Sequence, residues 1–175
     1  MRIGIVSDTH RNVEYLTEAA DWLIARHKIA TLYHLGDDYD DVKALAEKFI
    51  DIVQVPGLYD ERYTDKSVPK KVTENILGVR ILLVHSVDKD VTPDDKMTSD
   101  VILCGHTHHA EITLEDGLLC VNPGHLEGPK DKNFSPSFGL LDIQDKNISV
   151  KIFGLDFKLV SGMELFRSES RLYKV

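Results

Sequence analysis

Four short apolar runs in the first two thirds of the chain are each followed by Asp or His. The runs are strand-sized, and the residues after them carry oxygen or nitrogen donors. In open α/β folds the carboxyl ends of strands meet at one edge, where ligands bind. The pairs are Arg2–Val6 before Asp8 and His10, Leu32–Leu35 before Asp37, Arg80–Val84 before His85, and Val101–Cys104 before His106 and His108. The pattern predicts that these donors gather in one site.

Carboxylate and imidazole donors in such numbers predict a site for two divalent cations. An Asp between two cations is the usual bridge, and this donor set suits Mn, Fe, Ni, Co or Zn better than Ca or Mg. Each residue alone has an ordinary interpretation. An Asp after a strand is usually a turn residue or a helix cap, and a single His is more often a surface or core residue. The joint pattern in four segments favours the metal site.

The order of these motifs along the chain is specific. It reads Asp8-x-His10, Gly36-Asp37, Gly57-x-x-Asp60, His85, Gly105-His106-Thr107-His108 and Val121-Asn122-Pro123-Gly124. The series resembles the calcineurin-like metallophosphoesterases, and among them the small YfcE-like phosphodiesterases, over about residues 1–155. The resemblance implies an α/β (α+β) fold of the metallo-dependent phosphatase type, a two-sheet β sandwich flanked by helices. It also implies that a hydroxide held between two metals attacks phosphorus.

The resemblance assigns a role to each donor. It implies two divalent transition metals, with Mn the first choice and Ni, Fe, Co and Zn the alternatives. The implied ligands are Asp8, His10 and His108 for the first metal, Asp37 as the bridge, and His85 and His106 for the second metal. Asp37, His85 and His106 are also the residues expected to be catalytic.

One position departs from the family pattern in a way that matters for the chemistry. Family members usually have an Asn ligand of the second metal where this chain has Leu58, and Leu has no donor atom. The second metal would keep only Asp37, His85 and His106 as protein ligands. A smaller departure is His125, which stands where a Ser often follows Asn-Pro-Gly.

Two functions therefore stay open. The first is a metal-dependent phosphodiesterase or phosphatase, with a second metal site weakened by Leu58. The second is a protein-binding scaffold on the same fold that has lost catalytic ligands, like the retromer scaffold subunit. Retention of six of the seven expected ligands favours the enzyme, because a scaffold has no reason to keep mutually repelling imidazoles together.

Contacts with the substrate are harder to predict. Arg11, Asn12 and His125 are the candidates, although Asn12 has a preferred alternative as the N-cap of the helix that follows. A small phosphodiester or phosphomonoester is the expected substrate. The net charge of −8 argues against a nucleic acid duplex or an anionic membrane as partner, since both are bound through Lys and Arg. The sequence leaves a homo-oligomer open.

Composition and pattern also predict the organisation of the chain. With 42% apolar residues, the 175-residue chain can bury the core of a single domain. Residues 155–175 form a C-terminal extension of unassigned role, and no leader segment precedes the first strand, which predicts a cytoplasmic protein. The expected helices are Val13–Ile24, a second from an Asp41 cap to Phe49, and a short one within Asp88–Ser99. Seven strands are expected from Val72 onward, with turns at Gly78 and Asp116-Gly117.

Overall fold

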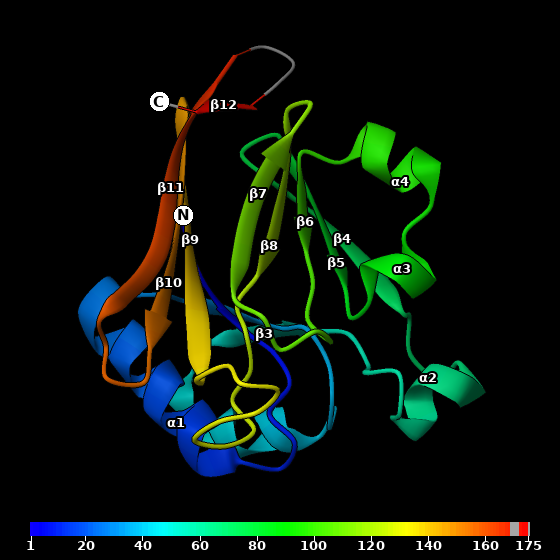
Figure 1. Ribbon diagram of the computed structural model, residues 1–175, viewed down its shortest axis with the longest axis vertical. Coiled ribbons are helices and arrows are strands. Elements are labelled where there is room, and N and C mark those ends of the chain that lie inside the picture. The colour runs from blue at the N-terminus through cyan, green and yellow to red at the C-terminus, as the bar shows by residue number, and fades with distance from the viewer. Residues whose placement is uncertain (169–171, 175) are drawn as a thin grey trace.

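Two β-sheets packed face to face make up the body of the protein, and helices lie outside them (Figure 1). The structure is a computed structural model that describes residues 1–168 and 172–174. One sheet has seven strands in the order β12-β11-β10-β9-β1-β2-β3, and the other has five in the order β4-β5-β6-β8-β7. The two-sheet sandwich flanked by helices that the sequence predicted is confirmed.

The seven-stranded sheet combines the two ends of the chain. Its parallel part is formed by β1, β2 and β3, and β9 pairs antiparallel with β1 to join them to the later strands. The strands are β1 (Arg2–Val6), β2 (Thr31–His34), β3 (Asp51–Gln54), β9 (Ser137–Ile143), β10 (Asn147–Gly154), β11 (Leu159–Arg167) and β12 (Leu172–Lys174).

The five-stranded sheet comes from the middle of the chain. Strands β5, β6 and β8 run parallel, while β4 and β7 flank them as antiparallel edges. The strands are β4 (Lys71–Ile76), β5 (Val79–Val84), β6 (Val101–Leu103), β7 (Glu111–Glu115) and β8 (Leu118–Asn122). Leu77 and Gly78 in one hairpin, and Asp116 and Gly117 in the other, take positive φ at the predicted turns.

Alternating residues of the central strands serve two different cores. Ile3 and Ile5 of β1 face the interior of the sandwich together with Ile81 and Leu83 of β5. Val6 of β1 faces the opposite way, into the layer under the first helix. Because successive side chains of a strand point to opposite faces, an unbroken apolar run such as RIGIV reads as a strand buried on both sides.

The helix α1 (Val13–Trp22) covers the outer face of the seven-stranded sheet. Its buried Leu16, Ala19 and Ala20 pack in the same core as Phe138 of β9. After Trp22 the backbone widens into a π-helix, Leu23–His27, and ends at Lys28 in the left-handed conformation. The predicted helix Val13–Ile24 is therefore confirmed in position, while its last turn differs in type.

The second predicted helix is present but is not α-helical. Residues Asp41–Lys48 form a 3-10 helix, and Asp40 takes the N-cap position. The prediction that Asp41 caps this helix is wrong, because its carboxylate instead accepts hydrogen bonds from Thr9 Oγ1 at 2.6 Å and from the Arg11 amide at 2.9 Å. Asp41 thus joins the helix to the loop after β1.

Short helices lie beside the five-stranded sheet. The expected single helix within Asp88–Ser99 is two helices, α3 (Val87–Asp90) and α4 (Pro93–Thr98), and α4 begins with a capping box between Thr92 and Asp95. A further helix, α2 (Glu61–Asp65), was not predicted. Its N-cap is Asp60, whose other oxygen accepts from the Tyr39 amide at 3.0 Å.

The C-terminal extension forms part of the seven-stranded sheet. Strand β11 pairs along its length with β10, and Leu165 is buried in the sandwich core. The Arg167 guanidinium donates to the carbonyls of Leu77 and Gly78 at 2.6 and 2.7 Å, which ties β11 to the β4–β5 turn. The segment had no assigned role from the sequence, and its residues 169–171 and 175 lie outside the described part.

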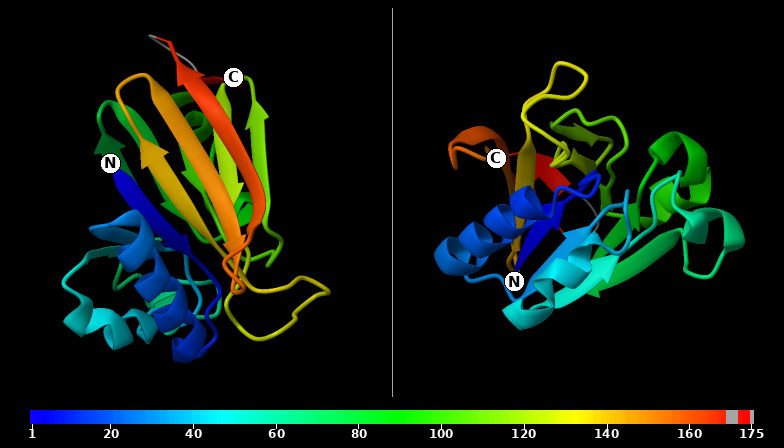
Figure 2. Two further views of the ribbon diagram at one scale, coloured as in Figure 1. Left: turned by 90° about the vertical axis from the view of Figure 1, so that its left-hand side faces the viewer. Right: turned by 90° about the horizontal axis from the view of Figure 1, so that it is seen from below.

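The carboxyl ends of the parallel strands from both sheets meet at one end of the sandwich. The Asp8 amide donates to the Gly36 carbonyl and the Gly105 amide to the His85 carbonyl, so these loops lie against each other. The loop 123–136, yellow in both figures, lies at the same end (Figures 1 and 2). Within the described residues, no helix is long and apolar enough to cross a membrane.

Candidate metal centre

The backbone at this end of the sandwich is strained at the residues that the sequence singled out. Non-glycine residues rarely take positive φ, and each such residue costs on the order of 1–3 kcal/mol unless the surroundings enforce it. Here all the expected ligands except His85 have this conformation. Their φ angles are 52° at Asp8, 45° at His10, 50° at Asp37, 70° at His106 and 63° at His108. Ten other described non-glycine residues, such as Lys28 and Leu77, also have positive φ, so this conformation supports a functional site only together with the grouping of the donors.

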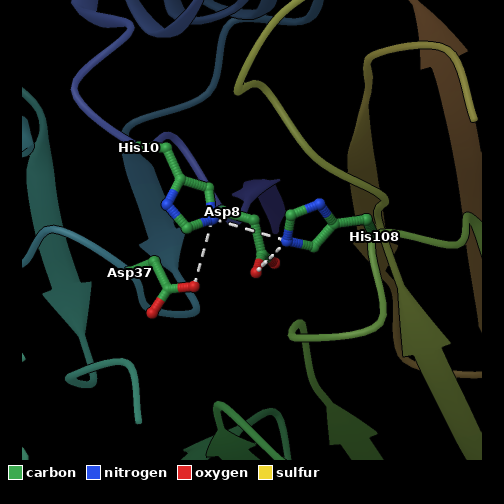
Figure 3. Close-up of side chains that lie close together, drawn as sticks. All are labelled: Asp8, His10, Asp37 and His108. Carbon is green, nitrogen blue, oxygen red and sulfur yellow. Dashed lines mark hydrogen bonds and ion pairs between the residues drawn. The ribbon is translucent and has the colours of Figure 1, made fainter. Parts of the chain in front are cut away.

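Four of the expected ligands form a closed group (Figure 3). One donor atom from each of Asp8, His10, Asp37 and His108 lies within 4.8 Å of the others. His10 Nε2 lies 3.3 Å from Asp37 Oδ2 and 3.4 Å from His108 Nε2, and His108 Nε2 lies 3.1 Å from Asp8 Oδ1. These are the four residues that the resemblance assigns to the first metal.

The carboxylate of Asp37 faces two different imidazoles. Its Oδ2 lies 3.3 Å from His10 Nε2, and its Oδ1 lies 3.5 Å from His85 Nε2. His85 Nδ1 lies 2.8 Å from the Leu35 carbonyl, so Nδ1 carries the hydrogen and Nε2 has a free lone pair. This Nε2 is buried without a hydrogen-bond partner among the described residues. Asp37 therefore lies between His10 on one side and His85 on the other, which is the place expected for a bridging carboxylate.

Glycines leave room for the two central carboxylates. A Cβ on Gly57 would lie 1.8 Å from Asp37 Oδ1, and a Cβ on Gly105 would lie 2.6 Å from Asp8 Oδ2. No larger residue fits at either position without displacing a carboxylate. The glycines of the Gly57-x-x-Asp60 and Gly105-His106 motifs are therefore explained by the close approach of these side chains.

Burial and mutual contact set the ionisation of the group. Burial alone raises the pKa of Asp8, but the hydrogen bond with His108 and the field of His85 outweigh it and lower the pKa to about 2. Burial alone lowers the pKa of His108, but the contact with Asp8 outweighs it and the pKa is raised. Burial raises the pKa of Asp37, and burial together with the nearby His85 lowers that of His106. A cation would relieve the repulsion between the imidazoles while keeping the carboxylates ionised.

The expected second site is more open than the first. The rings of His85 and His106 lie 5.2 Å apart, centroid to centroid, in an edge-to-face arrangement. Among residues 1–168 and 172–174, the donor atoms of Asp37, His85 and His106 do not all lie within 4.8 Å of one another, as those of the first group do. Leu58 is half-buried and adds no donor.

The donors present fit a divalent transition metal. The first group offers two imidazoles and two carboxylates, a set that such metals bind and that Ca or Mg does not prefer. His85 Nε2 is a buried lone pair with no other partner in the described structure, which is the state that a metal ligand needs. Asp8, His10, Asp37 and His108 would hold one cation, and Asp37, His85 and His106 a second.

The three candidates for substrate contact are placed very differently. Arg11 is exposed, and its Nε donates to Asp38 Oδ1 at 3.1 Å. Asn12 caps α1 by accepting from the Tyr15 amide at 3.2 Å, and its Nδ2 donates to the Glu127 carbonyl at 2.9 Å. The capping interpretation of Asn12 is thus confirmed, and both its Oδ1 and its Nδ2 make a hydrogen bond within the protein. His125 is 0% exposed, which leaves it no surface toward a substrate.

Several residues that position the ligands were not singled out from the sequence. Ser7 Oγ donates to Asp8 Oδ2 at 2.5 Å. Asn122 Nδ2 donates to the Gly105 carbonyl at 2.8 Å and to Thr107 Oγ1 at 2.9 Å, which holds the His106-Thr107-His108 turn. The Asn-Pro-Gly motif was a signal for Asn122. Ser7 stands next to Asp8 but carries no signal of its own.

A buried histidine supports the loop after β1. His34 Nε2 lies 3.2 Å from Thr9 Oγ1, which donates to Asp41. Burial lowers the pKa of His34 to about 4, so the ring is neutral at ordinary pH. His34 lies within the apolar run LYHL, where it resembles a core residue, and no pattern in the sequence connects it to Thr9.

Acidic residues of the loop 123–136 also reach the centre. Asp131 Oδ2 lies 2.5 Å from His108 Nδ1, and Glu127 Oε2 lies 3.5 Å from the same nitrogen and 4.0 Å from His10 Nε2. The Leu126 amide donates to the Asp8 carbonyl at 3.1 Å, which holds the loop against the site. Neither acid was predicted, because loop residues show no periodicity that would bring them to a strand edge.

Comparison with known proteins places the chain in a family. The calcineurin-like phosphoesterase superfamily domain matches residues 1–146. The phosphodiesterase MJ0936 of Methanocaldococcus jannaschii is 27% identical over 161 residues, which cover 83% of this chain and 95% of that protein. Among solved structures, Yfce, a phosphoesterase from E. coli, has a TM-score of 0.70 at 20% identity, covering 93% of this chain and 98% of the other.

A further structural relative is wild-type Vps29 of Entamoeba histolytica complexed with Zn²⁺. Its TM-score is 0.67 at 22% identity, and the match covers 95% of this chain and 99% of the other. These likenesses confirm the fold, and the family match spans most of the chain, including every residue of the metal centre. The chain belongs to the calcineurin-like phosphoesterase superfamily.

Proposed function

We propose that this protein is a metal-dependent phosphodiesterase that uses two divalent cations, the first held by Asp8, His10, Asp37 and His108. Membership of a phosphoesterase superfamily and the likeness to a phosphodiesterase support this proposal. The observation that carries it is the placement of Asp37, whose two oxygens face His10 on one side and His85 on the other. A carboxylate in that position could serve two cations at once.

The roles of the chain's own residues follow from this arrangement. When bound, a pair of divalent cations lowers the pKa of a water molecule and neutralises charge on the phosphate. Asp37, His85 and His106 are the residues we expect to be catalytic, because they would hold the second cation, whose smaller set of protein ligands leaves positions for a phosphate oxygen. Ser7 and the His106 amide hold the Asp8 carboxylate in place through hydrogen bonds.

A small substrate agrees with the surroundings of the centre. A cavity of about 250 Å³ is lined in part by Ser86, Gly105, His106 and Thr107. His106 is the one expected ligand that lines this cavity, and the net charge of −8 disfavours polyanions. We propose a small phosphodiester or phosphomonoester as substrate and Mn²⁺ as the first metal to test. The cytoplasmic location and any homo-oligomer stay predictions.

The alternative is a protein-binding scaffold on the same fold. The absence of a donor at Leu58 and the fold shared with Vps29 favour it. Because a Vps29 is itself complexed with Zn²⁺, metal binding alone does not separate the two functions. The family model and the likeness to a phosphodiesterase favour the enzyme.

Turnover decides between the two functions. Metal-free protein is reloaded with Mn²⁺, and hydrolysis of bis-p-nitrophenyl phosphate and p-nitrophenyl phosphate is measured, with Asp8→Asn as the control. The enzyme predicts hydrolysis of the diester that depends on Mn²⁺ and is lost in Asp8→Asn. Bound metal with no turnover of either compound, under Mn²⁺, Ni²⁺, Co²⁺ and Zn²⁺, would leave the scaffold.

The effect of Leu58 can be tested directly. Leu58→Asn nearly conserves volume and adds an amide oxygen where the family usually has one, so the second cation should bind more tightly. We expect a gain of about 10–100-fold in second-metal affinity, and faster diester turnover. Calorimetric titration with Mn²⁺ and rate measurements on both proteins check this. Equal affinity and equal rate would show that Leu58 does not limit the second site.

A further inference from the structure

His125 has the features of an unused metal ligand. The side chain is completely buried, although it stands where the family often has a small Ser. Its Nε2 lies 3.1 Å from the Phe134 carbonyl, so Nε2 carries the hydrogen and Nδ1 has the lone pair. Nδ1 has no hydrogen-bond partner among the described residues. An imidazole that donates one N–H to a backbone carbonyl and leaves the other nitrogen free is the usual state of a metal-bound His.

Further donors converge on the same place. The His125 ring stacks on that of His108, with the centroids 5.3 Å apart and the planes at 25°. One donor atom from each of His108, His125 and Glu127 lies within 4.8 Å of the others. Asp131 Oδ2 lies 2.5 Å from His108 Nδ1, and this oxygen is buried. Two carboxylates, those of Glu127 and Asp131, therefore lie beside the stacked pair of imidazoles.

This group is distinct from the first metal site. His108 turns Nε2 toward Asp8, while its other ring nitrogen, Nδ1, points away from Asp8 (Figure 3). Glu127 Oε2 lies 3.5 Å from this Nδ1. The group of His108, His125 and Glu127 contains neither Asp8 nor Asp37. Two groups thus share one imidazole and use its two nitrogens.

We propose that His125, Glu127 and the Nδ1 side of His108 form a further site for a divalent cation, with Asp131 beside it. Imidazoles and a carboxylate in this number suit a tetrahedral Zn²⁺ or Co²⁺. A bound cation would give the buried His125 lone pair the partner that it lacks among the described residues. The competing explanation is that Asp131 only orients His108 by a hydrogen bond, in which case His125 and Glu127 bind nothing.

The test is made in a protein whose other sites are disabled. An imidazole binds a cation at both nitrogens only when it has lost both ring protons, so a cation at the first site would compete with one at the further site. The first site is therefore weakened beforehand, in the Asp8→Asn, Asp37→Asn double variant. Co²⁺ is titrated into it and followed by calorimetry and by visible absorption. We expect one equivalent of Co²⁺ with the absorption of a tetrahedral site. The readout is binding, so it does not depend on the proposed hydrolysis.

Variants of the loop then identify the ligands. His125→Ser in the same background should abolish Co²⁺ binding, and Glu127→Gln should weaken it about 10–100-fold. Glu127 is 40% exposed, so its variant folds even if the buried His125→Ser does not. His109→Gln, at the neighbouring exposed histidine, is the matched control and should leave the affinity unchanged. No Co²⁺ bound in the background, or an unchanged affinity in Glu127→Gln, would overturn the proposal.

Discussion

At the scale of single residues, the function depends most on Asp37. Its carboxylate is buried, and its two oxygens are directed to histidines from different strands, His10 after β1 and His85 after β5. Within the proposed two-cation centre, Asp37 is the one ligand that both cations share, while Asp8, His10, His85, His106 and His108 each bind one of them. Removing the charge of Asp37 therefore weakens both sites, whereas removing one His weakens one.

Asp37→Asn should consequently lose more than any single His variant. We expect Mn²⁺ affinity to fall by at least about 100-fold, beyond the usual effect of changing an outer-shell partner, and diester hydrolysis to fall with it. Calorimetric titration of Asp37→Asn beside His10→Ala and His85→Ala measures this. Near-normal metal content in Asp37→Asn, together with its loss in either His variant, would rule out the bridge.

The pH dependence of metal binding follows from His108. Its pKa is raised in the metal-free protein, so its bound proton stabilises the fold below pH 6.5 and is lost as the pH rises through the raised pKa. A cation competes with that proton, and affinity must fall as the pH is lowered. Asp8, with a pKa of about 2, stays ionised near neutral pH and therefore adds nothing to the change of metal affinity with pH.

We expect Mn²⁺ affinity at the first site to decline steadily from pH 8 to pH 6, beginning above the pKa of free imidazole, about 6.5. Calorimetry at three pH values checks the slope. His34 is the internal control, because its ring, with a pKa of about 4, should stay neutral in NMR spectra over the same range. Affinity that is constant over this interval would contradict the ionisation described for His108.

At the scale of elements, the centre is built by loops that follow strands of both sheets. The loops after β1 and β2 bring Asp8, His10 and Asp37, and those after β5 and β6 bring the remaining ligands. The turn after β3 supplies no donor but passes so close to Asp37 that only Gly57 fits there. Space beside the carboxylate is as necessary as the carboxylate itself.

Gly57→Ala tests that requirement for space. The added Cβ would lie 1.8 Å from Asp37 Oδ1 and 2.5 Å from the Asp37 amide, so the carboxylate must move. We expect Mn²⁺ affinity to fall about 10–100-fold while the protein stays folded by circular dichroism. Gly162→Ala in β11 is the matched control, since its nearest neighbour is the Val150 carbonyl at 3.4 Å. Equal affinity in the Gly57 and Gly162 variants would show that Gly57 does not position Asp37.

The sequence predicted most of the strands, and the grouping of Asp8, His10, Asp37 and His108, because the donors directly follow apolar runs that read as strands. RIGIV and VRILLV read directly as strands, and their bounds, Arg2–Val6 and Val79–Val84, agree with the structure. Strand β11 was missed because apolar and polar residues alternate only weakly along it and most of its residues are exposed. Glu127 and Asp131 were missed because their approach to His108 depends on the path of a long loop, which residue spacing does not encode.

At the scale of the whole molecule, two buried cores hold the strand ends in place. One core lies between the two sheets, and the other lies between α1 and the outer face of the seven-stranded sheet. Arg167 ties the last long strand to the far hairpin. A rigid body of this kind can keep five ligands in the left-handed conformation, which isolated loops would not hold.

The location of bound metal tests the account most directly. Crystals soaked in Mn²⁺ can be measured for anomalous scattering, which places each ion independently of any assumption about function. We predict a strong peak about 2.0–2.2 Å from the donor atoms of Asp8, His10, Asp37 and His108. A weaker peak is predicted on the other side of Asp37, beside His85 and His106. Absence of any peak next to Asp37, or a strong peak only elsewhere on the molecule, would contradict the metal centre.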